Sequence, residues 1–424
     1  MALEYCLPRA TAGPRARLIA FSILCVGLPG AGWADGLSLI DAVGGSVGSA
    51  PDLEAAAAGV QAARAAAAGA AMTTPWETTF TLENFAGGGA ASGLDSAEGT
   101  IEFGRVVEAR AKREQRMRAS EAAVGAADAE TTVVRTKRVA RVCEQYIDTW
   151  VSQERARILI DVAEIGRGGV ATTQRRVESG RSSEAELASA RSLAAQAELE
   201  ARLASTRRDA GLAALRVLRG STASSAVVNL DWDGSVHDLE PLLPRFPAGI
   251  VRAEAERKQA EATLAYAMTQ RSADWHMAAG VRRLEDIDTE ALVFSVSRPL
   301  GAGKRAQPVI DEAAANLRRA EALGAAAAQD NQLERDQLRS EAELHRLELT
   351  TLEQSVVPQA LRARDVYRRG YHLGRFSFVE VSTAERDLLN ARTRVIDARA
   401  ALASAELAYR ILTGQWPEDA AHDK

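Results

Sequence analysis

Gly180-Arg181-Ser182-Ser183 returns as Gly374-Arg375-Phe376-Ser377, 194 residues further along the chain. A second segment, Leu215-Arg216-Val217-Leu218-Arg219-Gly220, returns at the same offset as Tyr409-Arg410-Ile411-Leu412-Thr413-Gly414. A constant offset between separate segments indicates two copies of one structural unit. We therefore expect a duplicated fold, in which each copy runs helix, two strands, long helix and returning helix.

Two terminal segments are expected outside these two copies. Residues 1–34 have the features of a signal peptide, because a positive region precedes an apolar run and a small-residue cleavage site. The apolar run is shorter than the roughly 20 residues that a helix needs to cross a bilayer. After cleavage we expect a first repeat at 35–230, a second repeat at 231–414 and a C-terminal tail at 415–424.

Composition and motifs argue against several classes of protein. The chain has 424 residues with a formal net charge of −5, and it has no basic stripe of the kind that nucleic-acid binding requires. The five histidines lack metal-ligand spacing, and no phosphate-binding glycine loop or nucleophile elbow occurs. We expect no enzyme, no cofactor and no nucleic-acid partner.

Four segments alternate between apolar and polar residues with period two, which indicates β-strands at about 76–84, 97–104, 274–282 and 291–298. Each is close in length to a tilted membrane-spanning strand of about 9–11 residues. A soluble sheet with one buried face would alternate in the same way, but the export leader and the charged inner partners favour a membrane. The residues expected to face the membrane are Trp76, Phe80, Leu82, Ile101, Phe103, Trp275, Leu292 and Phe294.

Four strands are too few for a closed membrane barrel, since the smallest ones have about eight. An open sheet edge in lipid would leave backbone groups unpaired, at several kcal/mol each. We therefore expect several copies of the chain to share one barrel.

Two long helical hairpins are expected at about 105–220 and 304–412. The last helix has apolar residues seven apart beside a column of alanines, which favours close side-by-side helix packing. At each turn a glycine suits the positive φ of a helix end, and a Ser-x-x-Glu motif resembles a capping box. The expected tip residues are Gly180, Arg181 and Glu186 in the first repeat, and Tyr371, Gly374, Arg375 and Glu380 in the second.

With these features the chain resembles the TolC-type outer-membrane efflux proteins, and in particular their CzcC-like branch, which serves heavy-metal export. The resemblance covers essentially the whole mature chain. It implies a mainly α fold with a membrane β-barrel contribution, in which a homotrimer forms one outer-membrane barrel and a periplasmic helical tunnel. Its local motifs are Leu82-Glu83-Asn84-Phe85-Ala86-Gly87, Ser297-Arg298-Pro299-Leu300 and Arg369-Gly370-Tyr371-His372-Leu373-Gly374-Arg375.

The resemblance also implies partners and a gate. The partners would be a periplasmic adaptor (membrane fusion protein), an inner-membrane pump of the resistance-nodulation-division class, and outer-membrane lipid. The family closes its tunnel through polar contacts at the hairpin tips, and Tyr371 occupies the tyrosine position of that turn. Glu380 aligns with the first carboxylate of the constriction, while Thr383 stands where a second is usual. Glu380 is therefore open to two interpretations, a gate residue and a helix cap.

The expected function is that of the exit duct of a tripartite efflux system, with heavy-metal cations as cargo. Multidrug efflux and type I protein secretion remain alternatives, because the pump makes most of the choice of substrate. A soluble periplasmic coiled-coil adaptor is the remaining class. Such an adaptor usually carries one helical hairpin within soluble β domains, whereas this chain has two hairpins and four isolated strands.

Overall fold

The computed structural model describes residues 36–48, 50–85, 87–89, 93–220, 228 and 246–414. The expected signal peptide at 1–34, the C-terminal tail at 415–424 and the expected boundary between the repeats, near residue 230, lie outside these residues.

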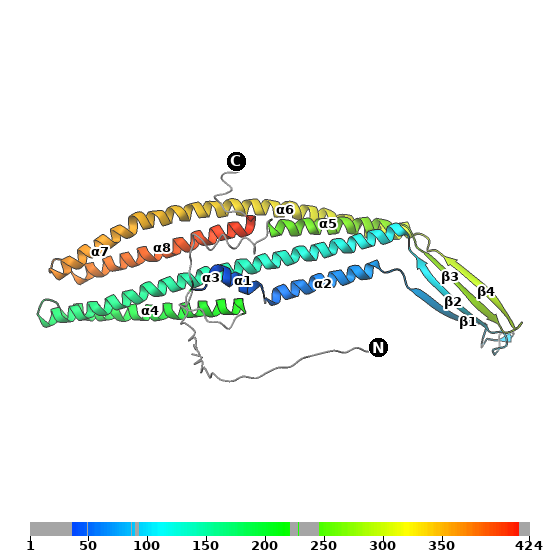
Figure 1. The fold of residues 1–424 in the computed structure, drawn as a ribbon, viewed down its shortest axis with the longest axis horizontal. Coiled ribbons are helices and arrows are strands. Elements are labelled where there is room, and N and C mark those ends of the chain that lie inside the picture. The colour runs from blue at the N-terminus through cyan, green and yellow to red at the C-terminus, as the bar shows by residue number, and fades with distance from the viewer. Residues whose placement is uncertain are drawn as a thin grey trace, which may run out of the picture. The chain divides into compact units, whose positions relative to one another are not determined.

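Two similar series of elements make up the described chain (Figure 1). The first is α1 (Leu39–Val47), α2 (Pro51–Ala71), β1 (Trp76–Glu83), β2 (Glu98–Val107), α3 (Arg110–Glu178) and α4 (Glu184–Arg219). The second is α5 (Ala248–Thr269), β3 (Trp275–Leu284), β4 (Thr289–Ser297), α6 (Ala302–Thr351), the π-helical turn η3 (Leu352–Val356), α7 (Val357–His372) and α8 (Phe378–Thr413). The sequence-based fold class, duplicated long helical hairpins with four strands, is confirmed.

The strands form one antiparallel sheet in the order β1-β2-β3-β4. The central pairing joins the two repeats, because β2 of the first pairs with β3 of the second. This pairing extends β2 to Val107, opposite Trp275, so α3 begins at Arg110 and not near residue 105 as the sequence indicated. Strands β1 and β4 lie at the two edges of this sheet.

Long helices extend from one end of the sheet, as the ribbon shows (Figure 1). Helix α3 has 69 residues, which at 1.5 Å per residue is a length of roughly 100 Å. In the second repeat α6 and α7 are joined through η3, where the N–H of Val357 donates to the carbonyl of Leu352. Pro358 follows directly and has no N–H to donate, so the π-helical turn lies where the regular helical pattern is interrupted.

The main hydrophobic core lies midway along α3, where α1, α4 and α8 pack against it. The hydroxyl of Tyr146 donates to the carbonyl of Leu37 over 2.6 Å, and Gln153 exchanges two hydrogen bonds of 2.9 Å with the backbone of Val228. Burial in this core raises the pKa of the Cys143 thiol to about 12, so Cys143 is a neutral packing group.

Within the described residues, no helix is both long enough and apolar enough to span a bilayer.

Candidate functional site

Both hairpin tips turn through the same backbone geometry. Gly180 and Gly374 have φ angles of +68° and +73°, a left-handed conformation that suits glycine. At the second tip the N–H of Gly374 donates to Tyr371 over 3.0 Å, and that of Arg375 donates to Gly370 over 2.8 Å. Together these bonds form a Schellman motif. The first tip repeats them, from Gly180 to Val177 over 2.9 Å and from Arg181 to Arg176 over 2.7 Å.

The helix caps that follow the two turns differ. Ser377 and Glu380 form a complete capping box, in which the Ser377 N–H donates to the Glu380 carboxylate over 2.7 Å and the Glu380 N–H donates to the Ser377 hydroxyl over 3.3 Å. In the first repeat only half of the box is present. The Glu186 N–H donates to Ser183, but the Glu186 carboxylate accepts from Ser182.

The sequence-based expectation of a complete box in both repeats is therefore wrong for the first. Ser182 occupies the position of Phe376 in the second repeat, and its hydroxyl competes for the carboxylate. At the second tip, hydrogen bonds from the backbone and then the hydroxyl of Ser377 lower the pKa of the Glu380 carboxyl below its ordinary value.

Tyr371 connects the two hairpins of the chain. Its side chain is buried, and its hydroxyl lies 3.3 Å from the Thr173 hydroxyl on α3. The guanidinium of Arg176, also on α3, lies 4.5 Å from the centre of the Tyr371 ring, and its Nη1 donates to the Tyr371 carbonyl over 3.0 Å. The guanidinium therefore binds both the π face and the backbone of Tyr371.

The turn around Tyr371 is packed too closely to admit a side chain at Gly370. A Cβ there would lie 2.1 Å from the Phe376 ring. Phe376 in turn packs against Tyr367, with 4.8 Å between ring centres. Gly370 is therefore required by the aromatic packing of the tip, whereas Gly374 is required by its φ angle.

A cavity of about 480 Å³ lies between the two hairpins, next to Tyr371. It is lined by apolar residues of α3 and α4 and by Glu385, Arg364 and Arg368 of the second hairpin. Burial raises the pKa of the Glu385 carboxyl above its ordinary value, and the positive charges of Arg368 and Arg364 oppose this shift.

The remaining expected tip residues are mostly exposed. Arg375 and Arg181 are both exposed, and neither side chain has a hydrogen-bond or ion-pair partner among the described residues. Thr383 donates its hydroxyl back to the carbonyl of Val379 over 2.9 Å. Within one chain, the structure therefore brings Tyr371 against the first hairpin but leaves Arg375 and Glu380 on the surface.

The strand register places all eight residues expected to face the membrane on one side of the sheet. One cross-strand row is Phe80, Ile101, Val281 and Leu292, and the next contains Phe103 and Phe294. These side chains are exposed, to 90% at Leu292 and 72% at Phe294. An apolar face that extends across four strands is unfavourable in contact with water. We therefore expect lipid or another apolar surface to cover it.

The opposite side of the sheet is polar. Arg282 donates to Glu98 over 3.0 Å and lies 3.5 Å from Glu83, and His276 lies 3.7 Å from Glu77. This alternation between an apolar and a charged side is the pattern of strands with lipid on one side and water on the other.

Among the described residues, no group of three or more His, Cys, Asp or Glu side chains is arranged to hold a metal ion.

The sequence did not single out Arg176 and Thr173, which carry the contact between the hairpins. The repeat offset contains a signal for the first of them, because Arg176 occupies the position of Gly370, one residue before Tyr371. An arginine in one copy where the other requires glycine indicates that the two tips are not interchangeable.

Comparison with known proteins agrees with this architecture. No family model matches the chain. The cobalt-zinc-cadmium resistance protein CzcC of Cupriavidus metallidurans is 29% identical over 312 residues, which cover 70% of this chain and 72% of that protein.

Several solved outer-membrane proteins have the same fold. The outer membrane protein VceC from Vibrio cholerae aligns with a TM-score of 0.73 and 19% identity, over 89% of this chain and 96% of that one. CusC aligns with a TM-score of 0.74 and 15% identity, over 88% and 91%. The Campylobacter jejuni channel CmeC aligns with a TM-score of 0.72 and 14% identity, over 91% and 88%. The chain therefore has the TolC-type channel fold, and its resemblance to the CzcC-like proteins is confirmed.

Proposed function

We propose that this chain is the outer-membrane exit duct of a tripartite efflux system, with its sheet in the outer membrane and its helices in the periplasm. The observation that carries the proposal is the four-stranded sheet with one exposed apolar side and one charged side, attached to two long helical hairpins. The channel folds of VceC, CusC and CmeC support the same function.

The duct is assembled from three copies of the chain. In a single chain the edge strands β1 and β4 have no further strand beside them, and lipid cannot satisfy their free backbone groups. Pairing β4 of one copy with β1 of the next satisfies both edges and closes the sheet into one barrel. The same symmetry brings three pairs of helical tips together at the far end of the helices.

The cargo is a heavy-metal cation, and the duct works with a periplasmic adaptor and an inner-membrane pump of the resistance-nodulation-division class. This part of the proposal rests on the similarity to CzcC, whose name describes resistance to cobalt, zinc and cadmium. In this arrangement the duct conducts what the pump delivers and binds no metal ion permanently.

A deletion strain tests the function directly. It should become sensitive to zinc, cobalt or cadmium and should recover when the gene is restored on a plasmid. Sensitivity to common drugs without sensitivity to metals would instead indicate a duct for multidrug efflux. A secretion defect alone would indicate a duct for protein export. Recovery of the chain in the soluble periplasmic fraction would refute the channel itself.

Assembly is tested separately on purified protein. Native mass measurement in detergent should give three times the mass of the mature chain. A monodisperse monomer in detergent would contradict the closure of the barrel by three copies.

A further inference from the structure

A tryptophan and an arginine form a pair at the helix end of each strand hairpin, on the apolar side of the sheet. Trp76 at the start of β1 lies directly across from Arg105 of β2, and the Arg105 guanidinium is 5.2 Å from the centre of the Trp76 ring. Trp275 at the start of β3 has the guanidinium of Arg298, the residue after β4, 5.0 Å from its ring centre. The duplication therefore preserves both the pair and its position.

These two guanidinium groups lack protein partners of their own. Among the described residues, neither the Arg105 nor the Arg298 side chain has a hydrogen bond or an ion pair, and each guanidinium lies over the face of its tryptophan. Trp76 is 70% exposed and Trp275 42% exposed. A guanidinium on an aromatic face keeps the N–H groups of its edge available for an anion.

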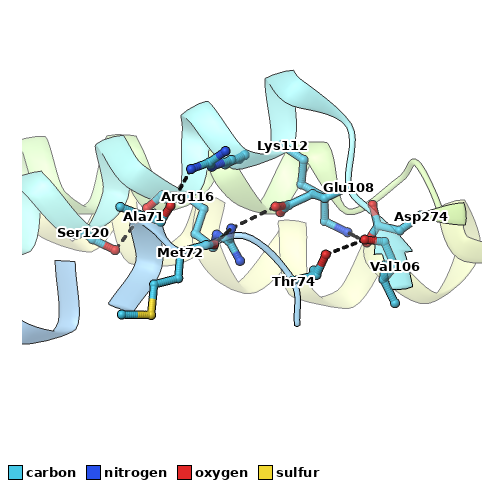
Figure 2. Close-up of polar contacts among 10 residues, drawn as sticks. Ala71, Met72, Thr74, Val106, Glu108, Lys112, Arg116, Ser120 and Asp274 are labelled. Carbon is cyan, nitrogen blue, oxygen red and sulfur yellow. Dashed lines mark hydrogen bonds and ion pairs between the residues drawn. The ribbon is translucent and has the colours of Figure 1, made fainter. Parts of the chain in front are cut away.

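The basic residues at the start of α3 are occupied within the chain, as Figure 2 shows for Lys112 and Arg116. Lys112 binds Asp274 over 2.6 Å, and Arg116 binds Glu108 over 2.8 Å. Arg113 donates to the carbonyl of Ala71 over 2.6 Å. The contacts of Arg113 and Lys112 connect α3 to the chain segments before β1 and β3, and that of Arg116 holds the link between β2 and α3. Arg105 and Arg298 differ from these residues of α3 because each guanidinium lies over a tryptophan ring and has no ion-pair partner among the described residues.

We propose that the two Trp–Arg pairs bind the phosphate groups of anionic phospholipids in the leaflet on the helix side of the membrane. This inference rests on the proposed function, which places the apolar side of the sheet in lipid. The apolar rows of Phe80 and Phe103 then contact the acyl chains, and the tryptophans lie at the headgroup level, where their amphipathic rings are favoured.

The chemistry of the pair fits a lipid phosphate. A planar guanidinium donates two parallel N–H bonds to phosphate oxygens, which a lysine ammonium cannot do. An arginine beside an anionic membrane surface contributes about a fivefold increase in affinity. Each of the two sites should therefore favour an anionic over a zwitterionic lipid by about fivefold.

The test uses the full-length protein purified in dodecyl maltoside and titrated with phosphatidylglycerol or phosphatidylcholine, with bound lipid counted by native mass spectrometry. The double variant Arg105→Gln/Arg298→Gln should lose about fivefold in affinity for phosphatidylglycerol at each site, with a smaller change for phosphatidylcholine, whose phosphate charge is balanced by choline. The variant Arg105→Lys/Arg298→Lys retains the charge without the planar fork and should lose an intermediate amount. It also provides the test if the glutamine variant does not fold.

The matched control is Lys304→Gln/Arg305→Gln, which removes two exposed basic residues from the start of α6 that contact no tryptophan ring. An equal loss in this control would show that diffuse charge explains the binding, and the inference would fail. It would also fail if the Arg105/Arg298 variant retained wild-type affinity, or if an equal concentration of inorganic phosphate displaced the lipid. The lipid-binding measurement does not depend on transport. A negative result in it would therefore not contradict the channel function, and the absence of metal sensitivity in the deletion strain would not contradict lipid binding.

Discussion

Arg176 and Tyr371, 195 residues apart in the sequence, form a charged contact that joins the two hairpin tips of the chain. The guanidinium of Arg176 covers the tyrosine ring and donates to the tyrosine carbonyl. A charge-assisted hydrogen bond of this kind contributes about 1.5–3 kcal/mol, and the cation–π contact adds about 0.5–1 kcal/mol. Within the described part of the chain, Arg176 therefore makes the stronger of the two polar contacts that hold Tyr371 against α3, the other being that of the Thr173 hydroxyl.

Arg176→Ala should loosen the closed tips. We expect a higher single-channel conductance in planar bilayers and greater sensitivity of cells to bulky antibiotics, because the second hairpin can then move away from the first. The matched control is Arg175→Ala, which removes the neighbouring arginine, an exposed residue whose side chain has no partner among the described residues. If both variants leak equally, or neither does, Arg176 does not hold the tip closed.

Tyr371→Phe should have a much milder effect than Tyr371→Ala. The phenylalanine variant loses only the contact with the Thr173 hydroxyl at 3.3 Å, a hydrogen bond that contributes about 0.5–1.5 kcal/mol. It retains the ring under Arg176 and the backbone carbonyl. A double-mutant cycle between Arg176→Ala and Tyr371→Ala, read by conductance, should show strong non-additivity. Additive effects would mean that the two residues act independently.

Glu380 acts as a helix cap within one chain, and a gate role requires neighbouring copies. If three copies of Glu380 help to close the tunnel, Glu380→Ala should leak more than Ser377→Ala. The serine variant removes the same cap at a cost of about 0.5–2 kcal/mol but retains the carboxylate. Single-channel conductance in planar bilayers measures the leak through each of the two variants. Glu186→Ala is not a matched control for Glu380→Ala, because the Glu186 carboxylate accepts from the Ser182 hydroxyl and not from the N–H of its cap residue Ser183.

The cap should also depend on pH. Since the pKa of Glu380 in the folded chain lies below its ordinary value of 4.5, the cap contributes its full stability above about pH 4.5. That contribution is lost as the pH falls through the lower folded pKa. In wild-type protein the tip should therefore become more open to hydrogen exchange below that pH, while Glu380→Ala should show no such transition. An identical acid transition in Glu380→Ala would assign it to another group.

Much of the fold was predictable because it is local and repeated. The 194-residue offset identifies two copies, and strict alternation identifies the strands and their outward residues, since period two fixes which side each residue faces. The glycines of the tips follow from the backbone geometry of helix ends.

The features that escaped prediction depend on contacts between distant segments. Pairing of β2 with β3 extends both strands beyond their alternating stretches, and no local pattern encodes it. The contact between Arg176 and Tyr371 depends on how two hairpins pack. The half-formed cap of the first repeat depends on competition between Ser182 and Ser183 for one residue, Glu186.

The assignment of the sheet sides can be tested with two adjacent residues of β1. Phe80, exposed to 66%, lies on the apolar side, and Thr79 lies on the charged side, directly across from Glu102. Phe80→Arg should cost about 2–4 kcal/mol near the middle of the bilayer, whereas Thr79→Arg should assemble normally beside a carboxylate. The amount of heat-resistant trimer recovered from outer membranes measures how well each variant assembles.

If the sheet were exposed to water on both sides, Phe80→Arg would be recovered at least as well as Thr79→Arg. Replacing an exposed phenylalanine by arginine then improves solubility and costs little stability. Equal recovery of the two variants, or better recovery of Phe80→Arg, would therefore contradict the membrane assignment. Leu292→Arg provides an independent repeat on β4, where the side chain is 90% exposed in the single chain and lies in the same cross-strand row as Phe80. A matching loss at Phe80 and Leu292, on the two edge strands, would indicate that lipid covers the whole apolar side.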